Sequence, residues 1–527
     1  MGVPRVFGWI VRKYPATFIK RNLPAEKKCS YLCYDVNGLL HPCVRKSIQE
    51  KGEYNIKDIR KSVSEKMYEL ANICKPTKGI LICIDGVAPL AKMLQQRYRR
   101  FKTVGEKEIE RRIYQKNGKP VPFSWDTNAI TPSTDFMVEM NKLFTEISAE
   151  MRAKYPSCDV YFSSSDEPGE GEHKIMDKLR TVDYTDDDSI YIHGLDADLI
   201  FLSIGLEKDN IYLMREGGAD GTLGYLDVSS LKEKLFVEIQ ALTRATLTPE
   251  RVEKDFMVIS YFLGNDFLPQ IFSSEVNDLS KLLNIYAEII DKHSSYLVDD
   301  GKIQWIILSH ICEKFGESEY VLVKNRVKNF MKMRISDDDI DSPIDKEIFW
   351  EKQKPHEDPL KLLEPGWKDR FYSHYFDFAP NDWNNKNNMI LNYLEGLQWN
   401  LNYYLKGANN WMWSYKYHAA PFFSDIYHYL TKRGTTQIVK NSHYISKTTN
   451  KPTSIEQLLV VLPPQSILLI PQKYRHLMND VERSDIIDLY PIGYKLEYYY
   501  KQRDWEHKPK LPDVEFSRIQ RALTYTQ

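Results

Sequence analysis

The stretch Tyr31-Leu32-Cys33-Tyr34-Asp35-Val36-Asn37-Gly38 sets the pattern on which the fold prediction rests. Its first four residues are apolar or aromatic, as is typical of a buried strand, and an acidic residue follows directly. Similar short runs recur at Ile80–Ile84, Val160–Phe162 and Ile190–Ile192, with longer helical patterns between them. Alternation of this kind over the first 275 residues predicts an α/β sheet domain.

Three of these predicted strands run directly, or within a few residues, into an acidic side chain. The three acids are Asp35, Asp85 and Asp196. Ligands of open α/β sheets bind at the carboxyl ends of the strands. We therefore expect the three acids to converge on one place.

The bulk composition describes an ordinary soluble protein of two or three packed units. The 527 residues carry a formal net charge of −1, so any binding of a polyanion must come from a local basic groove. The seven cysteines form no CxxC pair and lie mostly in apolar stretches, which favours reduced structural thiols over a disulfide framework. No signal peptide and no membrane-spanning run is apparent, so we expect no membrane association and an intracellular location. The cytoplasm is preferred and the nucleus is the alternative, because no basic localisation run is present.

Three regions are predicted along the chain. Residues 1–275 form an N-terminal α/β domain, and residues 276–365 form a variable connector with helices. Residues 366–527 form a second, aromatic-rich block, with an apolar helix at Ile390–Tyr404.

Seven carboxylates in short, mostly glycine-flanked motifs carry the strongest chemical indication. They are Asp35, Asp85, Glu170, Glu172, Asp196, Asp198 and Asp266. So many carboxylates share a pocket in ionised form only if cations neutralise them. Oxygen ligands without His or Cys favour Mg²⁺ or Mn²⁺, and two ions about 3.5–4 Å apart activate a water against a phosphodiester. Taken singly, an acid such as Asp35 is better explained as a helix cap or turn residue, and it is the recurrence over several motifs that favours the metal site.

A second indication directly follows Asp85. Lys92, Gln96, Arg99 and Arg100 fall at i, i+4, i+7 and i+8, which is one face of a helix. Such a face can hold a phosphate by charge-assisted hydrogen bonds. The alternative is a solvated basic face on a surface helix.

Three aromatic side chains are candidates for stacking on nucleic-acid bases. His41 lies six residues beyond Asp35, and Trp411 and Trp413 lie in the second block. Aromatic planes stack on bases without reading sequence. A structural role is at least as good an interpretation for His41, and core packing is the better one for each tryptophan alone.

At these residues the chain resembles the Xrn family of 5′→3′ exoribonucleases. The motifs that carry the resemblance are YDVNGLLHPC (34–43), DGVAPLAKMLQQRYRRF (85–101), WDTNAITPSTDFM (125–137), DEPGEGEHKIM (166–176), GLDADLI (194–200), GNDFLP (264–269), EPGWKDRFY (364–372) and YLEGLQWNLNYYLKGANNWMWSYKYHAAPFFSD (393–425). They cover both blocks of the family in order, outside the 276–365 connector. The long C-terminal extension of the large members is not present in this sequence.

The resemblance implies a PIN-like, flap-nuclease-related mixed sheet flanked by helices, with a mostly helical second block packed on it. Residues 1–275 are then the catalytic nuclease domain, and the block 366–527 is expected to complete its active-site pocket. It implies Mg²⁺-dependent, two-metal hydrolysis of single-stranded RNA bearing a 5′-monophosphate, stepwise to 5′-mononucleotides, in RNA degradation and mRNA decay. The seven acids match the family's metal-binding residues. Lys92, Gln96, Arg99 and Arg100 match its 5′-phosphate pocket, and His41 matches its base-stacking histidine. Trp411, or else Trp413, is the expected stacking partner. We expect a monomer, and the sequence names no protein partner.

Two other functions remain open from the residues. A flap-type endonuclease acting on DNA uses a similar acidic cluster, and its oligonucleotide products would distinguish it. A catalytically silent RNA-binding scaffold is the other alternative, although all seven acids are intact.

Overall fold

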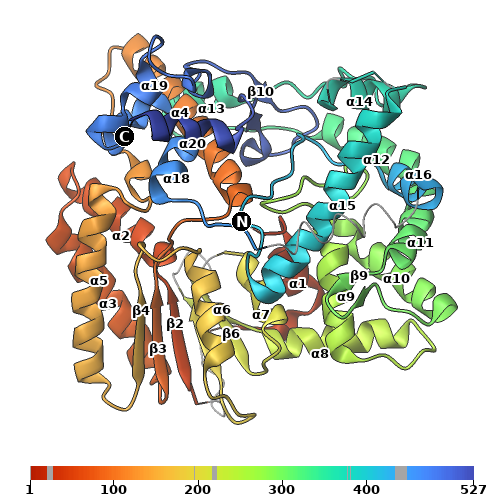
Figure 1. The fold of residues 1–527 in the computed structure, drawn as a ribbon, viewed down its shortest axis with the longest axis horizontal. Coiled ribbons are helices and arrows are strands. Elements are labelled where there is room, and N and C mark those ends of the chain that lie inside the picture. Colours follow the sequence, from red (N-terminus) through yellow and green to blue (C-terminus); the bar gives the residue numbers. More distant parts are fainter. Residues whose placement is uncertain are drawn as a thin grey trace. The chain divides into compact units, whose positions relative to one another are not determined.

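The structure, a computed structural model, describes residues 2–20, 28–194, 196–216, 222–376, 378–379, 381–433 and 448–526. The chain forms two compact units, each assembled from segments far apart in the sequence (Figure 1). The first comprises Met1–Pro89, Glu139–Glu319 and Asp382–Lys451. The second comprises Leu90–Val138, Tyr320–Asn381 and Pro452–Gln527. The division into 1–275, 276–365 and 366–527 follows sequence order instead, and it stays a prediction.

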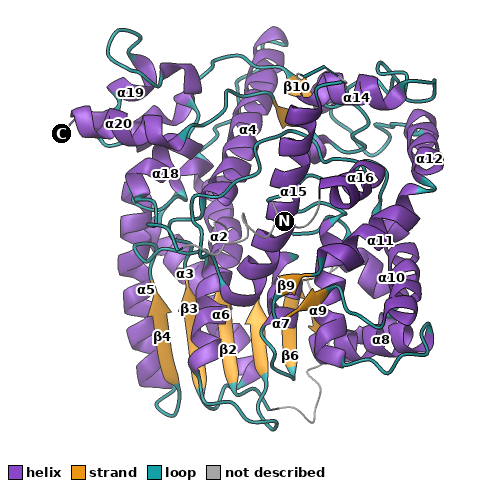
Figure 2. Cartoon of the chain, turned by 45° about the vertical axis from the view of Figure 1, so that its right-hand side comes forward, coloured by secondary structure: helices purple, strands orange, loops and turns teal. Residues whose placement is uncertain are grey.

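A mixed sheet is the centre of the first unit (Figure 2). Its strand order is β1-β7-β6-β5-β2-β3-β4. The neighbours β6, β5, β2, β3 and β4 are parallel, whereas β7 is antiparallel to both β6 and β1. The strands are β1 (Phe18–Lys20), β2 (Tyr31–Asp35), β3 (Gly79–Cys83), β4 (Asp159–Ser163), β5 (Ile190–His193), β6 (Ile211–Glu216) and β7 (Leu223–Asp227).

The predicted α/β class with a mixed sheet and flanking helices is confirmed. The four runs expected to be strands are β2 to β5, each within a residue of its predicted bounds. The sequence analysis did not identify β1, β6 or β7. All five residues of β2 and of β3 are buried, as expected for central strands covered by helices on both faces.

Helices cover both faces of this sheet (Figures 1 and 2). On one side α3 packs against β2, where the Tyr34 hydroxyl donates to the Met67 carbonyl at 2.7 Å. On the other side α6 packs against β2 and β3. Helices of this unit are α1 (Val6–Lys13), α2 (Val36–Lys51), α3 (Ile56–Cys74), α6 (Gly171–Thr181), α7 (Asp198–Gly205), α8 (Val228–Ala241), α9 (Pro249–Tyr261), α10 (Leu279–His293), α11 (Trp305–Gly316), α15 (Trp383–Lys406) and α16 (Phe423–Arg433), with the hairpin β8 (Val298–Asp299) and β9 (Lys302–Ile303).

At the amino ends of the central strands, an ion pair between the exposed Lys78 and the buried Asp188 links the starts of three strands. The Asp188 carboxylate accepts from Lys78 Nζ at 2.7 Å and from Ser30 Oγ at 2.6 Å. The backbone N–H of Thr185 also donates to it at 2.8 Å. Ser30, Lys78 and Asp188 directly precede β2, β3 and β5, so this contact fixes their relative register at the edge opposite their carboxyl ends.

Part of the second aromatic block belongs to the first unit. Helix α15, which contains the predicted helix Ile390–Tyr404, packs against α7 and α9. Tyr404 contacts the rings of Phe201 and Tyr261 at centroid distances of 5.9 and 5.8 Å. The carboxyl-terminal part of α15 is therefore held within an aromatic cluster beside the sheet.

The second unit is built around the long helix α4 (Leu90–Lys116). The guanidinium of Arg97, 1% exposed, donates to the carbonyl of Val460 at 2.9 Å and to that of Leu489. Further elements are α12 (Glu319–Lys332), α13 (Pro343–Lys352), α14 (Trp367–Phe376), α18 (Ser454–Val461), α19 (His476–Asn479), α20 (Phe516–Thr526), β10 (Leu496–Glu497) and β11 (Lys508–Pro509), and α5 (Asp135–Lys154) spans both units.

Two expectations about the whole chain can be compared with the structure. All seven cysteines lie among the described residues and are free, and six of them are buried. In the described part of the chain, no helix has the length and apolar character needed to cross a bilayer.

Candidate functional site

The carboxyl ends of β5, β2, β3 and β4 lie next to one another, because these strands are parallel neighbours. Asp35 is the last residue of β2 and is 9% exposed. Burial raises the pKa of its carboxyl well above the ordinary value, and nearby carboxylates raise it further. Those carboxylates belong to Asp85, Asp196 and Glu170. The structure therefore brings together acids that follow four different strands.

Asp85, two residues after β3, is held through both of its oxygens. Its Oδ2 accepts from Asn37 Nδ2 at 2.7 Å, and its Oδ1 accepts from the Gly171 N–H at 2.6 Å. A Cβ on Gly171 would lie 3.2 Å from the Oδ1 atoms of both Asp35 and Asp85, so those atoms are at most twice that distance apart. Only a glycine leaves this space open between the two carboxylates.

Two loops are joined by backbone hydrogen bonds beside Asp85. The Gly86 N–H donates to the Gly169 carbonyl, and the Gly169 N–H donates to the Val87 carbonyl, both at 2.8 Å. Gly169 has a φ of +117°, a conformation that other residues rarely adopt. This pairing explains the glycines of both motifs, because it holds the loop after β3 against the loop that leads to Glu170.

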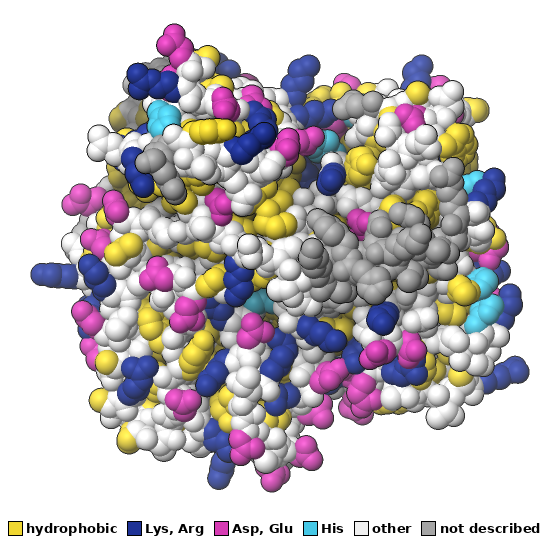
Figure 3. Space-filling view, in the orientation of Figure 1, with side chains coloured by type: hydrophobic (Ala, Val, Ile, Leu, Met, Phe, Trp, Pro, Cys, Tyr) yellow, Lys and Arg dark blue, Asp and Glu magenta, His cyan; other side chains and the backbone are white. Residues whose placement is uncertain are grey.

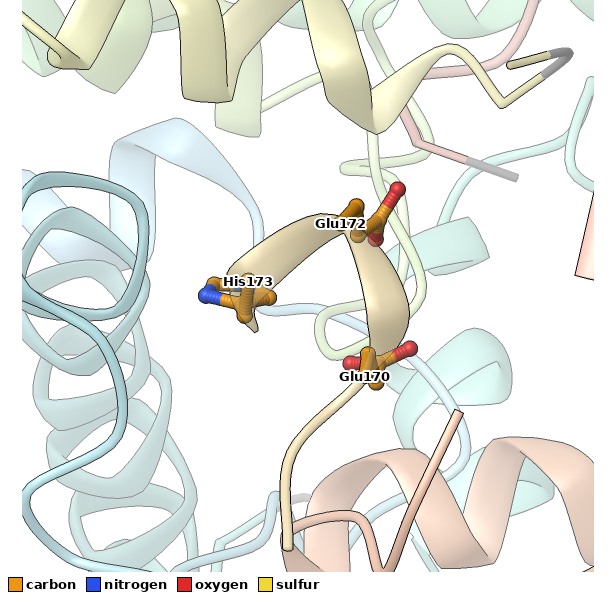
Figure 4. A group of neighbouring side chains, drawn as sticks. All are labelled: Glu170, Glu172 and His173. Atoms are coloured by element: carbon orange, nitrogen blue, oxygen red, sulfur yellow. The ribbon is translucent and has the colours of Figure 1, made fainter. Parts of the chain in front are cut away.

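Glu170 and Glu172 lie at the start of α6, and both are 5% exposed. Ligand atoms of Glu170, Glu172 and the neighbouring His173 lie within 4.8 Å of one another. Figure 4 shows Glu172 and His173 leaving the helix toward opposite sides. The His173 ring lies 3.9 Å from that of Tyr403. His173 directly follows Glu172 in the sequence, but its place beside these acids was not predicted.

Asp196 lies between β5 and α7, and Asp198 is the first residue of α7. The Asp198 N–H is 3.3 Å from Asp196 Oδ1, and Asp198 is 2% exposed. Gly2 approaches this segment closely: a Cβ there would lie 2.8 Å from Asp198 Oδ1. The Tyr404 hydroxyl donates to the same Oδ1 at 2.6 Å. The position of Asp198 is thus fixed from two sides.

Asp266 lies in the turn after α9. Its neighbour Asn265 organises that turn, because Asn265 Oδ1 accepts from the N–H groups of Phe267 and Leu268 at 3.0 and 2.8 Å. Asn265 Nδ2 donates to Asn400 Oδ1 at 2.7 Å. The charge of Asp266, like that of Asp198, contributes to raising the pKa of Tyr404 above its ordinary value, after burial. The turn that carries Asp266 is therefore joined to α15, the helix that also carries Tyr404.

The donor set of this cluster suits a hard divalent cation. Asp35 is buried among three other carboxylates, and such like charges ionise together only when a cation offsets them. The seven predicted acids offer oxygen ligands, which Mg²⁺ and Mn²⁺ prefer. All seven acids belong to the first unit, and Asp85, Glu170 and Asp196 act on the buried Asp35. Their individual roles as ligands stay predictions.

The four predicted phosphate-binding residues lie on α4, in the second unit. Lys92 and Arg100 are buried, Gln96 is half-buried and Arg99 is exposed. Burial, and then the charge of Arg99, lower the pKa of Arg100 to about 9. Arg100 Nη1 has no hydrogen-bond partner among the described residues. A buried cation in this state is suited to receive an anion.

Recognition of a polyanion has to come from such particular residues. On the face drawn in Figure 3, acidic and basic side chains are interspersed, in keeping with the net charge of −1. Arg97, one turn before Arg100 on α4, takes no part in the predicted phosphate-binding face, because its guanidinium is used inside the second unit.

The three stacking candidates lie in the first unit. His41 is exposed on α2. Trp413 is 3% exposed and its ring is stacked on Trp399 at 4.9 Å, which is the core packing that the sequence favoured for a lone tryptophan. Trp411 is 7% exposed, with Lys451 Nζ 5.1 Å from its ring centroid. Base stacking by these residues stays a prediction.

Comparison of the sequence with models of protein families identifies the family of this chain. A family model described as the XRN 5′-3′ exonuclease N-terminus matches residues 1–217, and one described as the Xrn1 helical domain matches residues 246–342 and 344–526. The chain belongs to the XRN 5′-3′ exonuclease family. The resemblance deduced from the motifs is thereby confirmed, and the family is one of hydrolases.

Curated XRN relatives match along nearly the whole chain. The 5′-3′ exoribonuclease 2 homolog of Drosophila melanogaster is 27% identical, over 99% of this chain and 71% of that protein. The 5′-3′ exoribonuclease 1 of Homo sapiens is 28% identical, over 99% of this chain and 34% of that protein. The 5′-3′ exoribonuclease 2 of Gallus gallus is 28% identical, over 99% and 70%. The chain thus spans about a third to seven tenths of these XRN relatives.

Among solved structures, the catalytic core of Rad2 in complex with DNA substrate matches at 12% identity and a TM-score of 0.33, over 72% of this chain and 96% of that chain. The T5 D15 protein co-crystallised with metal ions matches at 11% identity and a TM-score of 0.28, over 56% and 87%. Neither similarity is strong enough to inform the XRN site.

Proposed function

We propose that this protein is a divalent-cation-dependent 5′→3′ exoribonuclease that degrades 5′-monophosphorylated single-stranded RNA stepwise to 5′-mononucleotides. One observation supports the proposal: in a chain of the XRN family, four of the seven motif acids follow four neighbouring parallel strands, and the charges of Asp85, Asp196 and Glu170 act on Asp35. The cation is Mg²⁺ or Mn²⁺, bound as two ions. The protein acts as a monomer in the cytoplasm, in RNA and mRNA decay.

The acidic cluster is the proposed site of hydrolysis. Cations bound there supply Lewis-acid stabilisation and an activated water for attack on the phosphodiester. Asp35 ends β2, Asp85 follows the neighbouring β3 by two residues, and one oxygen of each lies near the space that Gly171 leaves open. The hydrogen bonds from Asn37 and Gly171 orient both oxygens of Asp85 before any ligand binds.

The 5′-phosphate is bound by the cationic face of α4. Lys92, Arg99 and Arg100 supply positive charge, and Arg100 remains cationic at neutral pH because its pKa of about 9 lies above that range. Lys92 follows Asp85 by seven residues, which limits their Cα separation to about 25 Å. The first bases stack on His41, with Trp411 as the proposed partner.

The decisive experiment follows the products of end-labelled RNA. We expect 5′-monophosphorylated RNA to yield mononucleotides with Mg²⁺ and to remain intact with EDTA. Oligonucleotide products from a branched DNA would instead favour the flap-type endonuclease. Equal rates on 5′-monophosphate, 5′-triphosphate and 5′-hydroxyl RNA would refute the phosphate pocket.

Matched variants separate catalysis from binding. Asp196→Ala should abolish Mg²⁺-dependent degradation while RNA is still bound. The control is Glu233→Ala, which removes an exposed acid from α8 in the same unit and should behave as the wild type. Wild-type degradation by Asp196→Ala would overturn the site assignment.

A corresponding pair tests the phosphate pocket. Lys92→Ala should slow degradation of 5′-monophosphorylated RNA and reduce the preference over 5′-hydroxyl RNA. Lys119→Ala, which removes an exposed lysine from the same unit, should leave that preference unchanged.

A further inference from the structure

Three side chains on one face of α15 touch three separate acid-bearing segments. Asn400, Tyr403 and Tyr404 fall at i, i+3 and i+4, so they share a face of the helix. We refer to these three residues as the α15 polar stripe. All three are buried, and Asn400 and Tyr404 are 0% exposed.

Each member of the stripe has a different partner. The Tyr403 hydroxyl donates to Glu170 Oε1, and the Tyr404 hydroxyl donates to Asp198 Oδ1 at 2.6 Å. Asn400 Oδ1 accepts from Asn265, the residue next to Asp266. The segments that follow β4, β5 and α9 are therefore all hydrogen-bonded to the single helix α15.

The rings around the stripe keep it in place. Tyr403 is stacked on Trp399 at 4.9 Å, with an interplanar angle of 14°, and it also meets Phe267 edge-on at 4.9 Å. Buried aromatic rings packed in this way have little rotational freedom, so the hydroxyls are aimed before a ligand arrives.

We propose that the α15 polar stripe presets the carboxylates of Glu170 and Asp198, and the turn of Asp266, for cation binding, so that the stripe determines divalent-metal affinity. The inference rests on the proposed function, because it takes these acids as the metal ligands. Partners that hydrogen-bond to ligating carboxylates orient them, and their loss typically weakens metal affinity about 10- to 100-fold. The tyrosines are positioning residues that act through the acids.

The test uses Tyr403→Phe and Tyr404→Phe in the full chain, with Mn²⁺ binding measured by calorimetry. We expect the dissociation constant for Mn²⁺ to rise about tenfold in each variant. The Mg²⁺ concentration for half-maximal RNA degradation should rise in parallel, whereas KM for RNA at saturating Mg²⁺ should not change. A purely structural role would lower the melting temperature without shifting either metal constant, and that outcome would overturn the proposal.

The same helix supplies a matched control. Tyr393 is 0% exposed, and its hydroxyl has no hydrogen-bond partner among the described residues. Tyr393→Phe should therefore leave Mn²⁺ affinity unchanged, and an equal loss in this variant would also overturn the proposal. Each tyrosine contacts a different acid, so either variant alone decides the question if the other does not fold.

Asp196→Ala distinguishes failure of the stripe from failure of the metal site. If Asp196→Ala loses Mn²⁺ binding while both tyrosine variants bind as the wild type does, the proposed function stands and only the role of the stripe fails. If Asp196→Ala binds Mn²⁺ as tightly as the wild type, the acidic cluster is not the metal site and both proposals fail.

Discussion

Replacing Gly171 with alanine tests whether the space between Asp35 and Asp85 is essential. The new Cβ would lie 2.9 Å from the Cys83 carbonyl oxygen and 3.2 Å from one oxygen of each carboxylate. Ordinary contacts of this kind begin near 3.4 Å. The start of α6 would therefore have to move by about 0.5 Å, and overpacking of this size costs about 1–3 kcal/mol of stability.

The same movement lengthens the hydrogen bond from the Gly171 N–H to Asp85, now 2.6 Å, and displaces Glu170 and Glu172. A misplacement of about 1 Å at reacting groups costs about 100-fold in rate, so we expect kcat to fall about tenfold. Single-turnover degradation of 5′-monophosphorylated RNA and urea unfolding measure the two effects separately.

Gly493→Ala is the matched control, because no atom lies within 4 Å of a Cβ built there. It should leave both stability and rate unchanged. A Gly171→Ala variant with wild-type kcat and wild-type Mn²⁺ affinity would refute the view that this glycine keeps the acids apart.

Three further predictions follow from single contacts. Gly2→Ala places a Cβ 2.8 Å from Asp198 Oδ1, at a position whose φ is +55°. Because this displaces the Asp198 carboxylate, the affinity for Mg²⁺ measured by calorimetry should fall about tenfold. An unchanged affinity would contradict the importance of this contact. Folding raises the pKa of Asp35 above its ordinary 3.8. Between these two pKa values the metal-free folded protein holds a proton that the unfolded chain has released. The free energy of unfolding therefore falls as pH rises through this range toward the folded pKa. Melting curves across this range should show a growing stabilisation by Mg²⁺, and a constant increment would refute the linkage. Burial raises the pKa of the Asp188 carboxyl, but its hydrogen bonds, first of all the one from Lys78, outweigh burial and lower the pKa overall. The stability that the ionised Asp188 contributes is therefore present above the pKa of the unfolded chain and is lost as pH falls through the folded pKa. Asp188→Asn should lower the melting temperature at neutral pH by about 3 °C and flatten its acid dependence, whereas a curve parallel to that of the wild type would argue against the ion pair.

The acid-bearing edge of the sheet could be predicted from sequence because its pattern is local. A short apolar run followed by an acid, as at Tyr34 and Asp35, predicts both a strand and an acidic side chain at its carboxyl end. Strands β1, β6 and β7 were not predicted, although β6 begins as an apolar run of the same kind.

The supporting contacts of the site could not be predicted in this way. Tyr403 and Tyr404 lie 233 and 206 residues from their acidic partners, and in the sequence they look like part of any aromatic helix. The hydrogen bond of Asn37 to Asp85 was not predicted from the motif that contains Asn37, because Asp85 lies in a loop 48 residues away. Burial of one lysine and one arginine of the basic face, Lys92 and Arg100, also depends on tertiary packing rather than on spacing.

The hydrogen bonds of the buried Arg97 guanidinium limit how far the protein chain can be truncated. A truncated chain that ends at residue 275 would keep every acidic side chain of the cluster, yet it would lack the carbonyl groups of Val460 and Leu489 that accept from this guanidinium. Losing the acceptors of a buried charge is strongly unfavourable, so helix α4 depends for its folding on a segment more than 350 residues downstream. Residues 1–275 consequently lack two of the acceptors that the buried charge of α4 requires.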